Sequence, residues 1–416
     1  MALAIDTIKV LVGSVIVLNL IPLLIWWERK GAAYIQDRRG PNRANILGIK
    51  LGGFIHSLAD VLKLLFKEDI IPSKAHRFIY LMAPVIVLVV AISVAAVIPF
   101  AAPLSIGGYA LTFQMADVNV GILYILAIAS LGVYGVMLAG WSSGSGYSLF
   151  GGLRASAQMI SYEVAMGLAL VGVILYAGTI RLDEMVSLQG AEIWNWYFVR
   201  QPMAFILFLV ALFAETNRNP FDLPEGESEL VAGYHTEYSS MKFALFFMAE
   251  YVHIVVGSMI LVSLFFGGWQ IPFLATEDLH KYMPLILKIS LPAAAFILIT
   301  GGAKLFGRTR KFGWGDLRDY EPAVGGAVMV LTGIAIAAVA ASGVLCILPD
   351  WFLSVSAALL QFSIFLAKTL FFCWFFIWVR WTLPRFRYDQ LMTLGWKVMV
   401  PLALINILVT AVIIGL

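Results

Sequence analysis

The sequence predicts an all-α, polytopic integral membrane protein, because it is strongly apolar, poor in charge and organised in long apolar blocks. Of its 416 residues, 61% are hydrophobic and only 13% are charged, and the mean hydropathy is +0.91. A soluble domain carries about 25% charged residues. Runs of about 20 apolar residues are what a hydrocarbon core of about 30 Å requires. The bilayer is therefore the predicted solvent of this chain.

Ten membrane spans are expected, within a single membrane domain covering 1–416. The first is followed by Glu28-Arg29-Lys30 without a small-residue cleavage site, which is typical of a retained span rather than a signal peptide. The fifth is short for a straight crossing. The expected spans are 8–27, 78–100, 119–140, 156–177, 202–217, 241–267, 284–304, 324–348, 353–380 and 395–415.

The basic residues predict how these spans are oriented. Of the 28 Lys and Arg residues, 22 fall in alternate loops on one side, beginning with the loop 28–77, four fall on the opposite side, and two lie within spans. Because Lys and Arg accumulate in cytoplasmic loops, this side is predicted to face the cytoplasm. Both termini are then expected on the outer side.

The first inner loop contains a predicted amphipathic helix over 46–66. Its apolar residues recur near helical spacing, and Asp60, Lys63 and Lys67 share another face. Such a helix is expected to lie at the membrane interface. A solvated basic loop that only fixes orientation is the alternative.

Six carboxylates crowd the segment 213–238, on the side that carries the positive charge. They are Glu215, Asp222, Glu225, Glu227, Glu229 and Glu237. Asp222-Leu223-Pro224 resembles a helix start, which would place Glu225 and Glu229 one turn apart. Like charges at that spacing raise each other's proton affinity, so the segment is expected to exchange protons. An exposed acidic loop that binds a basic partner or a cation is the alternative.

Acidic residues inside two spans favour proton handling. Glu163 lies in the fourth span and Glu250 in the sixth. An ionisable group at membrane depth usually faces a wet interior and marks a pathway, and Lys368 in the ninth span is interpreted in the same way. The two cysteines are far apart, the five histidines are scattered, and no phosphate-binding glycine loop is present, so no metal, iron–sulfur or nucleotide site is expected.

Several long strings resemble the quinone-chamber membrane subunit of proton-pumping NADH:quinone oxidoreductase, respiratory complex I. The resemblance covers roughly 1–270 and 351–416. The strings are Glu28-Arg29-Lys30, RRGPNR at 38–43, LADVLKLLFKED at 58–69, AQMISYEV at 157–164, AETNRNPFDLPEGESELVAGYHTEYSSMKFALFFMAEY at 214–251 and VRWTLPRFRYDQLMTLGWK at 379–397.

The resemblance implies a membrane subunit of a proton-translocating NADH:quinone oxidoreductase, with ubiquinone or menaquinone as bound substrate and no metal or flavin of its own. It implies a quinone chamber at Glu28, Arg29, Arg43, Asp60, Lys63 and Phe221. It also implies a proton route through Glu163, Glu215, Asp222, Glu225, Glu227, Glu229 and Glu250. The implied partners are the iron–sulfur and quinone-site subunits of a hydrophilic arm, small and antiporter-like membrane subunits, and the lipid of a bacterial inner membrane. No nucleic acid is expected.

Two departures from the family pattern stand out. His56-Ser57 replaces the usual Gln-Pro before Leu58-Ala59-Asp60. The family usually has eight spans, so 271–350 is interpreted as an inserted helical pair on the outside of the bundle, against lipid or a neighbouring subunit.

Three other functions remain open from the residues alone. A membrane-bound hydrogenase or a ferredoxin- or F420-linked dehydrogenase could use a related subunit, although the complete GPNR and DQLMTLGWK strings favour quinone reduction. A stand-alone cation or proton transporter predicts an internal repeat, which the sequence lacks. A purely structural anchor would not need Glu163 or Glu250.

Overall fold

The computed structural model describes residues 2–106, 109–223, 231–308, 320–342 and 349–415, and the described chain is almost wholly helical. Its longer helices are α1 (Ala2–Ile35), α3 (Arg77–Val94), α4 (Gly121–Ser142), α5 (Gly146–Ala177), α8 (Pro202–Glu215), α10 (Ser240–Phe265), α11 (Thr276–Arg308), α12 (Glu321–Ala341), α13 (Asp350–Thr382) and α15 (Val400–Gly415). Its shorter helices are α2 (Ile55–Phe66), α6 (Leu182–Gln189), α7 (Tyr197–Arg200) and α14 (Tyr388–Thr393). Two three-residue strands, β1 (Leu104–Ile106) and β2 (Tyr109–Leu111), form a small antiparallel hairpin.

The polytopic helical fold is confirmed. In the described ranges, nine helices are long and apolar enough to cross a membrane, and they correspond to nine of the ten expected spans. The remaining one, α8, has 14 residues and matches the span expected to be short. A π-helical turn, Leu394–Met399, joins α14 to α15, so that these two elements act as the last span.

Three helix boundaries were predicted wrongly. Helix α1 does not end at Glu28-Arg29-Lys30 but continues to Ile35, and α5 begins at Gly146, ten residues before the expected start. The amphipathic helix begins at Ile55 rather than at residue 46. Gly52 and Gly53 adopt left-handed backbone conformations just before it, with φ of 62° and 97°, and these break the helix.

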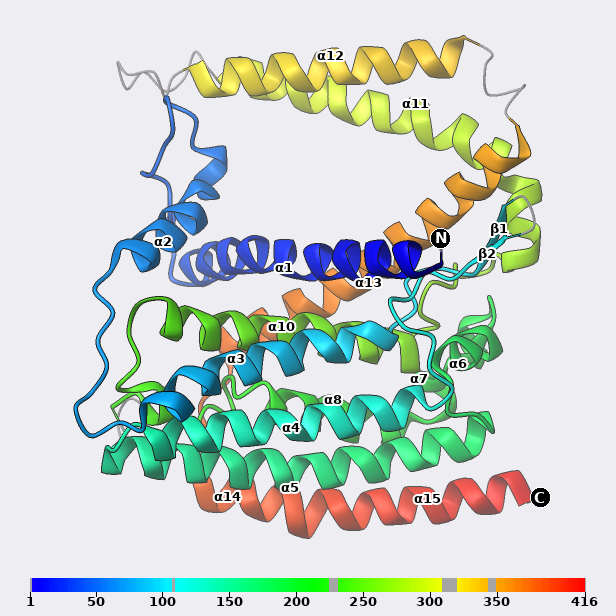
Figure 1. Ribbon diagram of the computed structural model, residues 1–416. Coiled ribbons are helices and arrows are strands. Elements are labelled where there is room, and N and C mark those ends of the chain that lie inside the picture. The colour runs from blue at the N-terminus through cyan, green and yellow to red at the C-terminus, as the bar shows by residue number, and fades with distance from the viewer. Residues whose placement is uncertain (1, 107–108, 224–230, 309–319, 343–348, 416) are drawn as a thin grey trace.

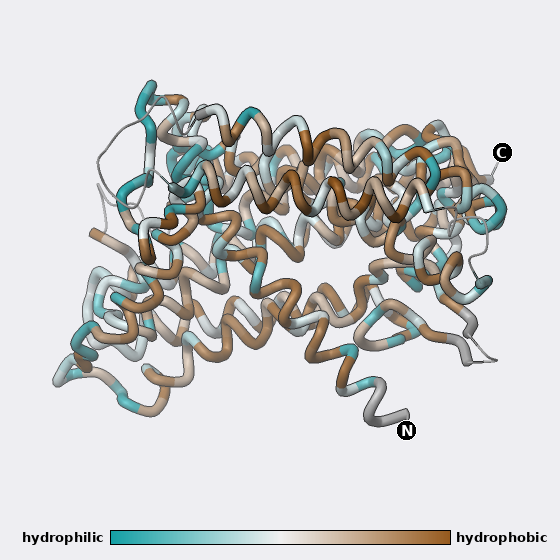
Figure 2. Tube along the Cα trace, turned by 90° about the horizontal axis from the view of Figure 1, so that it is seen from above, coloured by the Kyte–Doolittle hydropathy of each residue, from teal (hydrophilic) through white to brown (hydrophobic). Residues whose placement is uncertain are grey.

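The long helices run side by side, and α2 lies across one end of the bundle, which we call the α2 end (Figure 1). Both termini lie toward the opposite end. Hydrophobic residues follow the middles of the helices, and hydrophilic residues gather at both ends (Figure 2). This distribution is what a bilayer around the bundle requires.

The core of the bundle forms around α5 and α10. Helix α5 packs against α4, α8 and α15, and 78% of the central window of α10 is buried. Glycines permit the closest helix approach: a Cβ added at Gly140 of α4 would lie 3.1 Å from the Cα of Gly152 of α5. This tight packing fixes the helices that carry Glu163 and Glu250.

Helices α11 and α12 form a hairpin at the edge of the molecule (Figure 1). They pack mainly on each other, with smaller contacts from α11 to α13, and only 11% of the central window of each helix is buried. A Cβ at Gly326 would lie 2.7 Å from the carbonyl oxygen of Gly302, so the two backbones nearly touch. Most of this surface is therefore left for lipid or another chain.

Candidate functional site

Two buried ion pairs meet near the α2 end. Glu28 of α1, only 6% exposed, pairs with Arg380 near the end of α13. Arg218, in the loop after α8, pairs with Glu250 of α10 through Nη2 and Oε2 at 2.7 Å. Burying charges costs free energy that such pairs seldom recover, and apolar residues would fill the space at least as favourably. The pairs therefore favour a functional explanation over a stabilising one.

Tyr251 of α10 connects these two ion pairs. Its hydroxyl donates a hydrogen bond of 2.7 Å to Oε2 of Glu28, and its ring faces the Arg218 guanidinium, 4.8 Å from the ring centre. Tyr234 adds a third contact, since its hydroxyl donates to Oε1 of Glu250 at 3.2 Å. A change of charge at Glu28 is thus one side chain away from the Arg218–Glu250 pair.

Asp222 lies at the edge of this network. Its Oδ2 accepts from Nη2 of Arg385 at 2.8 Å, in the segment between α13 and α14. Burial raises the pKa of the Asp222 carboxyl to about 6, and the positive charge of Arg385 opposes this shift. Asp222 also interacts electrostatically with Glu250. The carboxyl can therefore exchange a proton near neutral pH.

The loop carrying Phe221 is held by one glutamine. Gln158 of α5 is fully buried, and its amide donates to the carbonyl oxygens of Ala214 and Phe221 at 2.8 and 2.9 Å and to Oδ1 of Asn217 at 3.2 Å. The Phe221 ring packs edge-on against Tyr162, with 5.5 Å between ring centres. Gln158 thus fixes the path of the chain between α8 and Asp222.

The other residues implied for the chamber lie nearer the surface. Arg29 of α1 pairs with Asp60 of α2 at 2.5 Å, and both side chains are about two-fifths exposed. Arg43 and Lys63 are exposed. The six chamber residues are therefore not gathered in one cavity: Glu28 and Phe221 are inside the bundle, and the other four lie around its rim.

The departure His56-Ser57 lies where α2 joins α1. The Ser57 hydroxyl donates to the carbonyl oxygen of Pro22 at 3.1 Å, and the His56 ring contacts the carbonyl oxygen of Gly53 at 3.2 Å through Nδ1. These two side chains thus anchor the start of α2 on the first span and on the preceding turn.

A cavity of about 550 Å³ opens between α1, α13 and the turn before α2. Trp374 and Trp378 stack along one wall, with ring centres 5.6 Å apart, and Lys30 is a polar group in the lining. Trp26 and Trp27, interpreted from the sequence as interface residues without a special role, line it as well. An apolar cavity with few polar groups is typical of a site for a hydrophobic small molecule.

The acids expected along the proton route are partly brought together. Glu163 of α5 and Glu215 of α8 interact electrostatically, and Glu250 lies in the ion-pair network. Glu225, Glu227 and Glu229, with the helix expected after Asp222, lie outside the described residues. The described part of the route therefore has two groups of acids, one around Glu215 and one around Glu250.

Lys368 belongs to neither group, contrary to its interpretation as a pathway residue. Its ammonium donates to the carbonyl oxygens of Phe266, Gly268 and Gln270 at 2.8 to 3.0 Å and lies 4.3 Å from the centre of the Trp196 ring. These carbonyls follow the C-terminal end of α10, where a cation is stabilising. Lys368 therefore caps that helix.

Sequence reasoning missed Gln158, Tyr251 and Arg380 as site residues. All three lie inside the strings that carry the family resemblance, which was the available signal. Among the described residues, no group of three or more His, Cys, Asp or Glu side chains could hold a metal ion.

Comparison with known proteins places this geometry in a family. The family model for NADH dehydrogenase matches residues 8–311 and 320–411, and so includes most of 271–350. NADH-quinone oxidoreductase subunit 8 of Rhodothermus marinus is 45% identical over 391 residues, covering 94% of this chain and 91% of its own. An NADH-quinone oxidoreductase H subunit of Cytophaga hutchinsonii is 40% identical, covering 92% and 89%, and that of Bdellovibrio bacteriovorus is 38% identical, covering 99% and 96%. The chain belongs to the family formed by this membrane component of NADH-quinone oxidoreductase.

Proposed function

We propose that this chain forms the quinone chamber of a proton-translocating NADH:quinone oxidoreductase and carries the first part of its proton route. The observation that supports this most directly is Tyr251, which contacts both the Glu28–Arg380 pair and the Arg218–Glu250 pair. Quinone is the substrate, ubiquinone or menaquinone, and this chain supplies no metal or flavin.

The cavity between α1 and α13 is the proposed entrance for quinone. Its tryptophan-rich wall suits an apolar tail, while Lys30 and the nearby Arg29–Asp60 pair suit a polar head group. From there the head group would move toward Glu28 and Phe221. An iron–sulfur subunit of the hydrophilic arm would supply the electrons.

Reduction of a quinone to a quinol consumes two protons and changes the local charge. Charged groups at close range respond through shifted proton affinities. In this proposal, a charge change at Glu28 alters the Arg218–Glu250 pair through Tyr251, and the acids pass protons toward the antiporter-like subunits. Asp222 is a proton-exchanging group at the edge of the chamber.

The proposed environment follows from the charge distribution. The protein spans a bacterial inner membrane, the α2 end and the basic loops face the cytoplasm, and both termini face outward. The basic loops would contact the quinone-site subunits of the hydrophilic arm. Helices α11 and α12 are the proposed peripheral hairpin against lipid or a neighbouring membrane subunit.

Photolabelling of the intact complex with a photoreactive quinone analogue tests the chamber. Labelled peptides are expected from 26–67, 220–237 and 374–378, and excess unlabelled quinone should abolish the labelling. Competable labelling confined to other parts of the chain, such as α11 and α12, would overturn the proposed chamber.

A further inference from the structure

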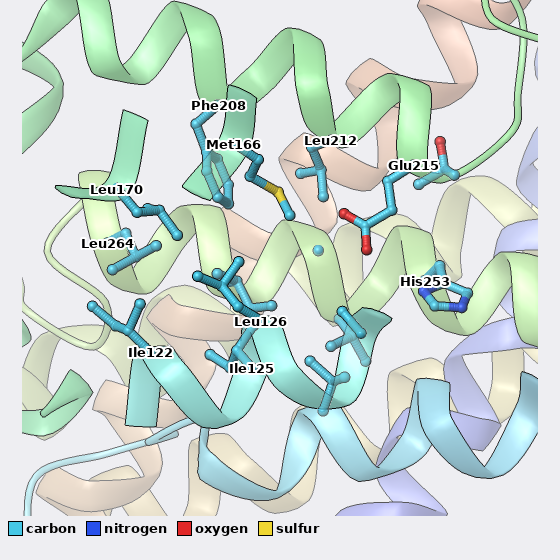
Figure 3. A pocket seen from close by; sticks show the side chains of 16 residues that line it. Ile122, Ile125, Leu126, Met166, Leu170, Phe208, Leu212, Glu215, His253 and Leu264 are labelled. Carbon is cyan, nitrogen blue, oxygen red and sulfur yellow. The ribbon is translucent and has the colours of Figure 1, made fainter. Parts of the chain in front are cut away.

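A second, smaller cavity lies inside the bundle between α3, α4, α5, α8 and α10 (Figure 3). Its volume is about 30 Å³, which is room for one or two water molecules. Almost the whole lining is apolar. Only Glu215, Thr216 and His253 bring polar side chains, and the Thr216 hydroxyl is already bonded to the carbonyl oxygen of Phe213 at 2.9 Å.

Glu215 and His253 have no protein partner for their polar atoms in the described part of the chain. Glu215 extends its carboxylate from α8 into the cavity, and the His253 imidazole lies at the same end on α10 (Figure 3). Both keep some accessible surface, although their neighbours Ala214 and Val252 are fully buried. Leaving two such groups without hydrogen bonds costs several kcal/mol, so water is their natural partner here.

His253 also stands between the two groups of acids. On α10 it is three residues after Glu250, hence on the same face, and the two side chains interact electrostatically. Across the cavity, Glu215 interacts with Glu163 of α5. No other titratable side chain lines this cavity, so His253 is the titratable residue that adjoins both acids from its wall.

We propose that water in this cavity joins Glu215 to His253, and that His253 transfers protons between Glu215 and Glu250. This inference rests on the proposed function and adds to it a carrier and a water site. A protonated Glu215 gives its proton to water, which passes one to the neutral imidazole. The imidazolium then releases the proton on its other nitrogen to the Glu250 carboxylate. One proton moves, and no electron or further reactant is needed.

The first test uses His253→Gln in the assembled complex, reconstituted in liposomes. Glutamine keeps a polar group in the cavity but does not titrate. Proton uptake per electron is expected to fall by about tenfold or more, since a positioned acid–base group contributes about 10²–10⁴-fold to proton transfer. His280→Gln, at an exposed position on α11, is the matched control and should match the wild type.

Glu215→Gln separates this inference from the proposed function. If Glu215→Gln impairs pumping and His253→Gln does not, the acidic route stands and the role of His253 is wrong. If neither variant changes the proton-to-electron ratio, both are wrong. If both lower it, both are supported.

A structural measurement covers the case in which His253→Gln fails to assemble. A map of the wild-type complex that resolves ordered water should show density between the Glu215 carboxylate and the His253 ring. In Ala129→Leu, whose larger side chain fills the cavity, this density and the pumping should be lost together. A dry cavity in the wild type, or normal pumping with the cavity filled, would overturn the proposal.

Discussion

The Tyr251 hydroxyl donates a hydrogen bond of 2.7 Å to the Glu28 carboxylate, although the two residues are 223 positions apart in the sequence. The same ring lies over Arg218, the partner of Glu250. This contact joins the first span of the protein to the helix that carries Glu250. The proposed coupling between quinone and protons depends on it.

Tyr251→Phe should weaken the coupling without disturbing the packing. The ring stays over Arg218, but Glu28 loses a hydrogen bond to a charged group, which is worth about 1.5–3 kcal/mol. Quinone-reductase activity of the assembled complex should fall by about tenfold or more. Tyr282→Phe removes an exposed hydroxyl on α11 and is the control. Equal activities of the two variants would argue against a role for the hydroxyl.

Gln158→Glu should disorder the loop between α8 and Asp222. The substitution is isosteric, but it replaces an amide donor with a carboxylate facing three oxygen acceptors. Unsatisfied buried groups cost about 1–3 kcal/mol each, so the thermal stability of the complex should drop measurably. Gln36→Glu at an exposed site should leave it unchanged. Unchanged stability in Gln158→Glu would contradict the assigned hydrogen bonds.

Asp222 should titrate with a pKa of about 6, above its ordinary value of 3.8. The native state then holds this proton more tightly than the unfolded chain, so the group's contribution to stability decreases as pH rises from about 4 through 6. Infrared difference spectra should show a carboxyl band that titrates in this range and disappears in Asp222→Asn. Arg385→Gln removes the opposing positive charge and should raise the midpoint. A band that titrates near 4 would contradict the burial of this group.

The α11–α12 hairpin should tolerate Gly307→Ala but not Gly326→Ala. Alanine favours a helix over glycine by up to about 1 kcal/mol at either site. A Cβ at Gly307 meets nothing within 4 Å, whereas at Gly326 it meets the Gly302 carbonyl oxygen at 2.7 Å. Hydrogen exchange in 276–308 and 321–341 should therefore accelerate only in Gly326→Ala. Quinone-reductase activity should remain at the wild-type level in both variants, because the hairpin packs mainly on itself.

The sequence was sufficient for the spans because apolar length decides whether a helix crosses a bilayer, and even the short α8 was expected. Helix ends were less predictable. The charges at Glu28-Arg29-Lys30 do not stop a helix that leaves the bilayer, and the break before α2 depends on left-handed glycines. Partner choice could not be predicted at all. Arg380 is 352 residues from Glu28, and only the packing of α13 on α1 brings them together.

The site shows the same limit. Glu163, Glu215 and Glu250 stood out because charge is costly at membrane depth. Nothing in the sequence distinguished His253 from the other scattered histidines, because its role depends on a cavity formed by five helices. Lys368 stood out for the same reason as the acids, yet it caps a helix end.

The most direct test of the account is the proton-to-electron ratio of Glu250→Gln in the reconstituted complex. This substitution keeps an oxygen for the Tyr234 hydroxyl but removes the charge that pairs with Arg218. The account predicts that both quinone reduction and the number of protons pumped per electron fall below wild type. A wild-type ratio at a wild-type rate would contradict it.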